Sequence, residues 1–95
     1  MSTAYERVKG RVDELEARFY ALLDAVDDYA DLLDELTVEQ ESSETPDPEL
    51  IRRFAHQRSH TDDLREQIEG PPMDTLLRVV DRILMIRETE EGRFL

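Results

Sequence analysis

Residues 5–36, YERVKGRVDELEARFYALLDAVDDYADLLDEL, decide the fold. Apolar side chains recur in this stretch with spacings that alternate between three and four residues. They are Tyr5, Val8, Val12, Leu15, Phe19, Leu22, Val26, Tyr29, Leu33 and Leu36. This heptad pattern is typical of a helix that packs against other helices. Thr3 and Glu6 have the spacing of a capping box, so we expect a long N-terminal heptad helix over residues 3–38.

The apolar stripe of this helix changes width along its length. Its early flanks are charged, and its later flanks are apolar. The early flanking residues are Lys9, Arg11, Glu16 and Arg18, and the later ones are Leu23, Ala25, Ala30 and Leu32. A narrow stripe contacts one neighbouring helix, whereas a broad stripe contacts two.

The rest of the chain predicts two shorter helices after an acidic linker over residues 39–47. Asp47 caps a second helix over residues 48–69, with Pro48 at its first position, and Gly70-Pro71-Pro72 ends it. A third helix is expected over residues 72–91. The sequence therefore predicts an all-α fold, a three-helix antiparallel bundle that forms one domain over residues 1–95.

A difference in helix length predicts a homodimer with coiled-coil-like packing. The second helix spans only ~33 Å at 1.5 Å per residue and does not reach the first turns of the longer helix. Those uncovered turns carry the narrow stripe, so we expect them to meet a second copy of the chain. The predicted dimer interface is Tyr5, Val8, Val12 and Leu15. The pattern leaves open whether the two copies run parallel or antiparallel.

The charge is strongly acidic and unevenly distributed. The chain has 24 Asp and Glu against 12 Lys and Arg, a net charge of −12. This excess argues against direct nucleic-acid binding. Residues 24–49 hold eleven acids and no base. The predicted acidic face comprises Asp24, Asp27, Asp28, Asp31, Asp34 and Glu35. It is a solvated surface, a docking surface for a basic protein, a mimic of nucleic acid, or a site for a divalent cation.

The acid excess, with eleven Arg and one Lys, is also typical of proteins from salt-adapted microbes. A basic band on the second helix comprises Arg52, Arg53, Arg58 and Arg65. In an antiparallel pair of helices we expect Arg52 and Arg53 to lie near Asp34 and Glu35 and to pair within the chain.

His56 and His60 are one helical turn apart, and Asp63 follows on the same side. This spacing can bind a transition metal through imidazole and carboxylate ligands. Gln57 stands where a zinc protease of the HExxH type has its general base, so that class is excluded. The alternatives are that both histidines face solvent or bond to acids of the first helix, or that they act as a pH-sensitive switch.

No catalytic motif or cofactor signature occurs in the sequence. There is no cysteine, no glycine-rich phosphate loop and no apolar run of membrane-spanning length. We therefore expect a non-catalytic interaction or regulatory adaptor: a cytoplasmic homodimer, without a cofactor or membrane contact, from a halophilic organism. The alternatives are a metal-binding helical protein and an acidic nucleic-acid mimic that binds a basic protein.

Overall fold

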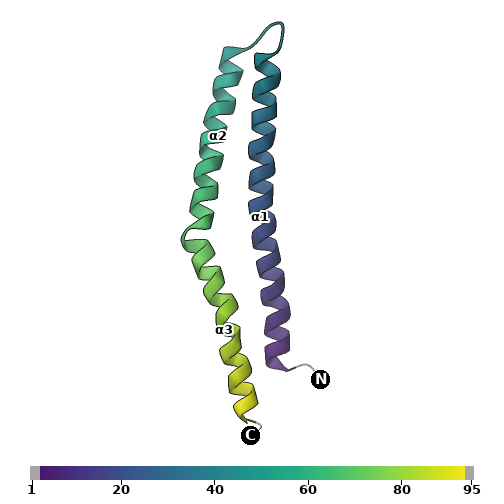
Figure 1. The fold of residues 1–95 in the computed structure, drawn as a ribbon, viewed down its shortest axis with the longest axis vertical. Coiled ribbons are helices and arrows are strands. Elements are labelled where there is room, and N and C mark those ends of the chain that lie inside the picture. Colours follow the sequence, from purple (N-terminus) through teal and green to yellow (C-terminus); the bar gives the residue numbers. More distant parts are fainter. Residues whose placement is uncertain (1–2, 94–95) are drawn as a thin grey trace.

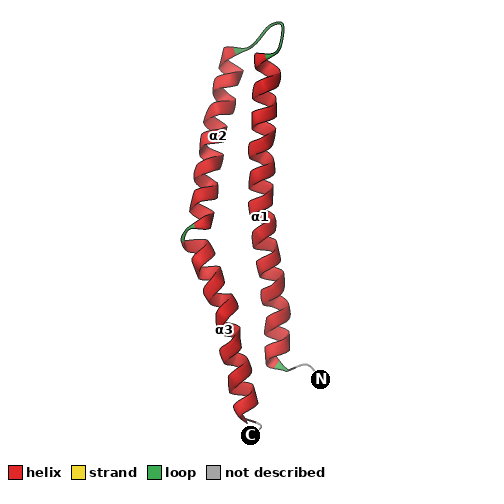
Figure 2. Cartoon of the chain, viewed as in Figure 1, coloured by secondary structure: helices red, strands yellow, loops and turns green. Residues whose placement is uncertain are grey.

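The computed structural model describes residues 3–93, which form three helices (Figure 1). These are α1 (Ala4–Glu41), α2 (Pro48–Glu69) and α3 (Pro71–Arg93). No strand occurs among these residues, so the all-α prediction is confirmed (Figure 2). The molecule measures 75 × 25 × 12 Å. Because an α-helix with its side chains is about 10–12 Å across, the fold is two helices wide and one helix thick.

The capping box at the start of α1 is present. The Thr3 hydroxyl accepts a hydrogen bond from the Glu6 N–H at 3.1 Å, and the Glu6 carboxylate accepts one from the Thr3 N–H at 3.3 Å. The helix ends at Glu41, beyond the predicted end at residue 38, and Ser42 follows as its C-cap. The connection to α2 is correspondingly shorter than predicted.

The start of α2 also has the expected cap. The Asp47 carboxylate accepts hydrogen bonds from the N–H groups of Glu49 and Leu50 at 3.0 and 3.3 Å. Pro48 occupies the first turn, where its missing N–H leaves no bond unmade. The helix ends at Glu69, immediately before Gly70.

The predicted bundle requires the third helix to run back beside the other two, and it does not. Only Gly70 separates α2 from α3, and the two helices follow one another along α1 as one bent rod (Figure 1). Reversal between antiparallel helices takes a loop of about two to five residues, so one residue is too few. Pro71 and Pro72 fit in the first turn of α3, where helical N–H groups have no partner. The chain is therefore a helical hairpin and not a three-helix antiparallel bundle.

The buried residues form a single line between the two rods. Their positions on all three helices are Val12, Leu23, Val26, Ala30, Leu33, Thr61, Ile68, Leu76 and Ile83. No large side chain among the described residues is fully enclosed. This follows from the one-helix thickness, since two rods can cover each other on one side only.

The buried line departs from the predicted heptad stripe at Leu15, Leu22 and Tyr29. Leu23 and Ala30 are buried, whereas Leu15, Leu22 and Tyr29 are 49%, 48% and 41% exposed. The broad stripe was expected to contact two helices, but α2 and the start of α3 follow one another as a single rod on one side of the second half of α1. One flank of the stripe is therefore covered, and the other is left in contact with solvent.

None of the described helices combines the length and the apolar composition that crossing a bilayer requires.

Candidate interaction surfaces

The first turns of α1 are covered by α3 of the same chain. The Arg87 guanidinium lies 5.7 Å from the centre of the Tyr5 ring. The Glu90 carboxylate accepts hydrogen bonds from the N–H groups of Ala4 and Tyr5 at 2.9 and 2.6 Å. Val12 is buried at 8% exposure. The predicted reason for a dimer at these turns was that no helix of the chain reaches them, and this reason does not hold.

Of the four predicted interface residues, Leu15 is the one that remains exposed. Tyr5 and Val8 are half-buried. The chain does leave apolar surface of α1 uncovered, but this surface extends toward the middle and the far end of the helix. The predicted dimer interface at Tyr5, Val8, Val12 and Leu15 stays a prediction. The apolar surface that the structure leaves exposed on α1 begins at Leu15 and continues toward the loop.

An apolar ridge follows α1 on this uncovered side. We define the α1 ridge as the residues at seven-residue intervals Val8, Leu15, Leu22, Tyr29 and Leu36. Leu32, beside the ridge, is 46% exposed. Near the loop, the ridge borders a shallow hollow between α1 and α2. This hollow is lined by Tyr29, Leu32, Leu33, Leu36, Arg53, Phe54, His56, Gln57 and His60.

At the other end of the molecule the ridge borders a second hollow, between α1 and α3. This hollow has the apolar floor Val8, Val12, Val79, Ile83 and Ile86, with the exposed Arg78 and Arg82 at its edge. An adjoining hollow on α1 shares Val8 and Val12 and is lined by the exposed Arg7 and Arg11. We define the arginine-rimmed groove as these two hollows together. Among the ion pairs between described residues, none involves Arg7, Arg78 or Arg82. These three guanidinium groups, with Arg11, which pairs with Glu14 at 3.4 Å, surround an apolar groove in a chain whose net charge is −12.

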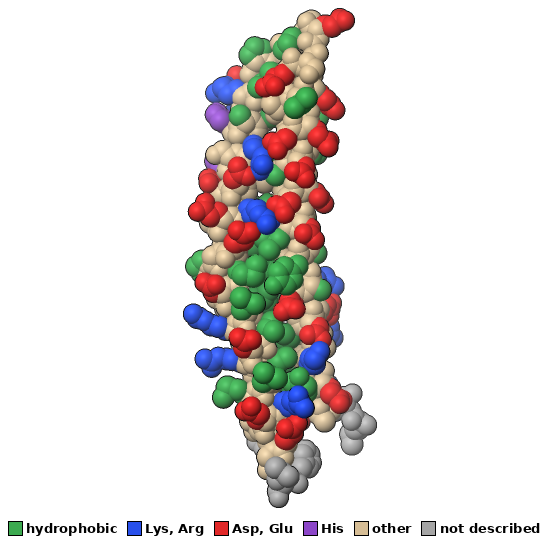
Figure 3. Space-filling view, viewed as in Figure 1, with side chains coloured by type: hydrophobic (Ala, Val, Ile, Leu, Met, Phe, Trp, Pro, Cys, Tyr) green, Lys and Arg blue, Asp and Glu red, His purple; other side chains and the backbone are tan. Residues whose placement is uncertain are grey.

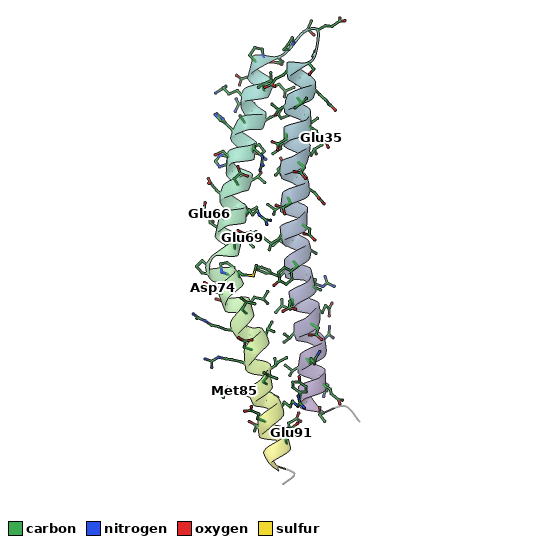
Figure 4. The ribbon with its side chains drawn as sticks, viewed as in Figure 1. Glu35, Glu66, Glu69, Asp74, Met85 and Glu91 are labelled. Carbon is green, nitrogen blue, oxygen red and sulfur yellow. The ribbon has the colours of Figure 1, made fainter. Side chains whose placement is uncertain are left out.

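The acidic residues of α1 divide into two groups. Asp27 pairs with Arg65 at 2.7 Å, and Asp34 pairs with Arg58 at 3.1 Å, so these two carboxylates join α1 to α2. The ion pairs between described residues include none to the other four predicted members, Asp24, Asp28, Asp31 and Glu35. Figure 4 shows Glu35 on the side of α1 turned away from α2. This second group is available to a partner.

Arginines of α2 do pair with carboxylates of α1, but they are not the two arginines that the sequence predicted. Arg52 and Arg53 both bind Glu49 on their own helix, at 2.5 and 3.0 Å, and not Asp34 or Glu35. They lie in the first turns of α2, close enough in sequence to Glu49 for an i,i+3 and an i,i+4 pair. The inter-helix pairs instead come from Arg58 and Arg65, further along α2, where the buried face of the helix turns toward α1.

The predicted metal ligands His56, His60 and Asp63 are all exposed on α2. The two histidines line the hollow beside Tyr29, whose hydroxyl accepts a hydrogen bond from the Gln57 amide at 2.9 Å. In residues 3–93, no three His, Cys, Asp or Glu side chains are grouped so that they could hold a metal ion. The structure therefore brings no ligand from α1 to this pair, and a metal here would need ligands from another chain.

Hydrogen bonds to neighbouring carboxylates raise the pKa of two cations. The bond to Asp13, followed by its charge, raises the pKa of Lys9 above its ordinary value. The bond to Glu91, and then its charge, likewise raises the pKa of Arg87. Both side chains are about half exposed and keep their positive charge throughout the neutral pH range.

Two structural residues are absent from the sequence-based expectations. Thr61 is buried at 6% exposure, and its hydroxyl donates to the Gln57 carbonyl at 2.7 Å. Thr61 lies seven residues after Phe54 and seven before Ile68. This spacing was a usable signal that the middle of α2, which is otherwise polar, also packs against α1. Glu90 had no such signal, because its contact with α1 depends on the direction that α3 takes.

Comparison with protein-family models, with curated proteins and with solved structures finds no match to this chain.

Proposed function

We propose that this protein is a non-catalytic interaction adaptor that works as a homodimer. The observation that carries the proposal is the exposed α1 ridge on a fold one helix thick. Leu15, Leu22 and Tyr29 each keep more than two fifths of their surface in solvent, in a row along one helix. Contiguous exposed apolar surface of this kind marks interaction sites in soluble proteins. Covering it with a second copy supplies the second helix layer that the hairpin lacks.

The acidic half of α1 is the second part of the proposal. Asp24, Asp28, Asp31 and Glu35 have no partner among the ion pairs of the described residues, and complementary charge favours a basic protein at this face. The same carboxylates keep the surface hydrated in concentrated salt, in line with a halophilic source. A cytoplasmic location remains part of this proposal.

The self-association is tested by the mass of the protein in solution. Light scattering at 0.1 M and 1 M NaCl should give twice the 11.1 kDa mass of the chain. Leu22→Asp should reduce the mass to that of one chain, because it places a charge in the middle of the ridge. Ala17→Asp, on the exposed opposite side of the helix, is the matched control and should stay dimeric. A wild-type mass of 11.1 kDa at both salt concentrations would contradict the proposal.

The partner proposal is tested separately. The full chain and a variant with Asp24→Asn, Asp28→Asn, Asp31→Asn and Glu35→Gln are immobilised, and the bound fraction of a cell extract from the source organism is identified. We expect basic proteins to be retained by the wild type and lost with the variant. Equal retention by both forms would show that these four carboxylates do not recruit partners. A retained set dominated by DNA-binding proteins would favour the nucleic-acid mimic.

A further inference from the structure

We propose that two copies pair antiparallel along the α1 ridge, so that the arginine-rimmed groove of each copy receives the acidic second half of α1 from the other. The inference rests on the self-association proposed above and adds the surface, the direction and the residues that hold it.

The first step concerns which face of the hairpin is used. On the helical periodicity of α1, Asp27 and Asp34 lie at one edge of the buried line and Leu22 and Tyr29 at the other. The Arg65–Asp27 and Arg58–Asp34 pairs therefore cross one face, and the α1 ridge follows the opposite face.

The face crossed by the ion pairs is a poor match to itself. Figure 3 shows a face on which Lys and Arg side chains reach between the helices among many carboxylates toward the loop end, while an apolar patch fills only the other half. Two copies placed antiparallel on such a face would bury carboxylates against apolar side chains, which is costly. The ridge face avoids this cost, because its apolar residues run from Val8 to Leu36.

The second step concerns the symmetry of the ridge. Leu22 lies at the middle of the ridge and near the middle of α1, which spans Ala4–Glu41. An antiparallel second copy centred on Leu22 therefore sets Leu15 against Tyr29, and Val8 against Leu36. A two-fold dimer requires a patch that is complementary to itself. The ridge meets this requirement, because apolar residues lie at equal distances on both sides of Leu22.

The third step concerns charge, which decides the direction. Beside the ridge, the first half of α1 carries Arg7, which has no ion pair among the described residues, and Arg11 and Arg18, which both pair with Glu14. The second half is acidic at Asp28, Glu35 and Glu39. The groove adds Arg78 and Arg82 from α3 to the basic half. Parallel pairing would set the arginines without an ion pair, Arg7, Arg78 and Arg82, against the same arginines of the other copy, and the acidic second halves of α1 against each other. Antiparallel pairing sets the arginines of each copy against the acidic half of the other.

The fourth step concerns what fills the groove. In the second half of α1, Ala25 and Leu32 extend the apolar surface beside the ridge, and Leu32 is 46% exposed. Placed on the groove of the other copy, these side chains meet Val79 and Ile86, which are 40% and 37% exposed. The carboxylates that flank them then lie beside the arginine rim.

The available area is sufficient for a stable dimer. The ridge face belongs to a slab of 75 by 25 Å. Covering half of a face of that size exceeds the ~800 Å² per partner that a standard protein interface buries.

Cysteine cross-linking tests the direction, because the chain contains no cysteine of its own. Leu15→Cys and Tyr29→Cys are made separately, each alone is treated with a short bismaleimide, and then the two are mixed and treated. We expect cross-linked dimer in the mixture and little with either variant alone. In an antiparallel dimer, two copies of residue 15 are ~20 Å apart along the helix, beyond the reach of the reagent. Ala17→Cys is the control and should not cross-link.

Charge reversal tests the groove. Arg7→Glu with Arg11→Glu should weaken the dimer by about tenfold at 0.1 M NaCl, since every charge pair that is lost occurs twice by symmetry. Glu35→Arg with Glu39→Arg should weaken it similarly, and mixing the two variants should restore affinity.

The outcomes separate this inference from the proposed function. Self-cross-linking of Tyr29→Cys within a dimer would show parallel pairing, and a dimer without any ridge cross-link would show another surface. Failure of the two charge variants to restore affinity on mixing would remove the groove as the recognition site. Each of these results overturns the inference and leaves the homodimer standing, whereas a monomeric wild type overturns both.

Discussion

Val26 and Val38 show how differently two identical side chains of α1 contribute to the fold. Val26 is buried at 7% exposure and belongs to a cluster with Leu23 and Ile68, whereas Val38 is 59% exposed. Val26→Ala removes two buried methyl groups and should lower the free energy of unfolding by about 2 kcal/mol. Val38→Ala should change it by less than ~0.5 kcal/mol, since alanine favours the helix and little packing is lost. Urea unfolding followed by circular dichroism measures both, and equal effects would contradict the buried line described here.

The same scale shows what the sequence could and could not predict about the core. Val12 was assigned to contact with a second copy, and it is buried within the chain instead. The heptad spacing correctly placed Val26 and Leu33 on the packed side of α1. It could not decide between Leu22 and Leu23, or between Tyr29 and Ala30, because both members of each pair are apolar neighbours. Which one is buried depends on the side from which α2 approaches, and that is a tertiary choice with no local signal.

At the scale of elements, the capped starts of α1 and α2 were predictable, whereas the end of α1 and the direction of α3 were not. Capping at Thr3 and Asp47 depends on side chains within three residues of the backbone groups they satisfy, so the sequence contains the whole interaction. The course of α3 depends on the geometry of a one-residue break at Gly70. The candidate acidic face was predictable as a set of charges, but its division into paired and unpaired members required the positions of Arg58 and Arg65 on the packed α2.

Glu90 provides a test of the position of α3 beside α1. Its carboxylate accepts hydrogen bonds from the N–H groups of Ala4 and Tyr5, at the positive end of the α1 dipole. Glu90→Ala should lower the free energy of unfolding by about 1 kcal/mol, the scale of a charged cap at a helix N-terminus. Hydrogen exchange of the first α1 amides should accelerate selectively.

Glu88→Ala is the matched control for that experiment. Glu88 is exposed on the same helix, and the hydrogen bonds of the described residues include none to its side chain. It should leave both the free energy of unfolding and the exchange rates nearly unchanged. Unaltered exchange in the Glu90 variant would mean that α3 does not hold the start of α1 in solution.

At the scale of the whole molecule, the uneven charge couples stability to salt. Eleven acids without a base occupy residues 24–49, and the last turn of α1 has no basic residue to balance its dipole. Carboxylates at that end cost a few tenths to about 1 kcal/mol each at low salt. Screening shortens from ~10 Å at 0.1 M to ~3 Å at 1 M, so most of this repulsion disappears. The two inter-helix ion pairs weaken as well, but they are exposed and contribute little.

We therefore expect the free energy of unfolding to rise by about 1 kcal/mol or more between 0.1 M and 1 M NaCl, by relief of these repulsions. The variant neutralised at Asp24, Asp28, Asp31 and Glu35 should lose most of this dependence and be more stable than the wild type at low salt. Asp81→Asn with Glu88→Gln, two acids of the arginine-containing α3, should retain the dependence. Urea unfolding of the Leu22→Asp background at each salt concentration removes any contribution from association. A wild-type stability that falls with salt would mean that attractive pairs outweigh the repulsion among the carboxylates of α1, and the salt-adapted interpretation of the composition would then be wrong.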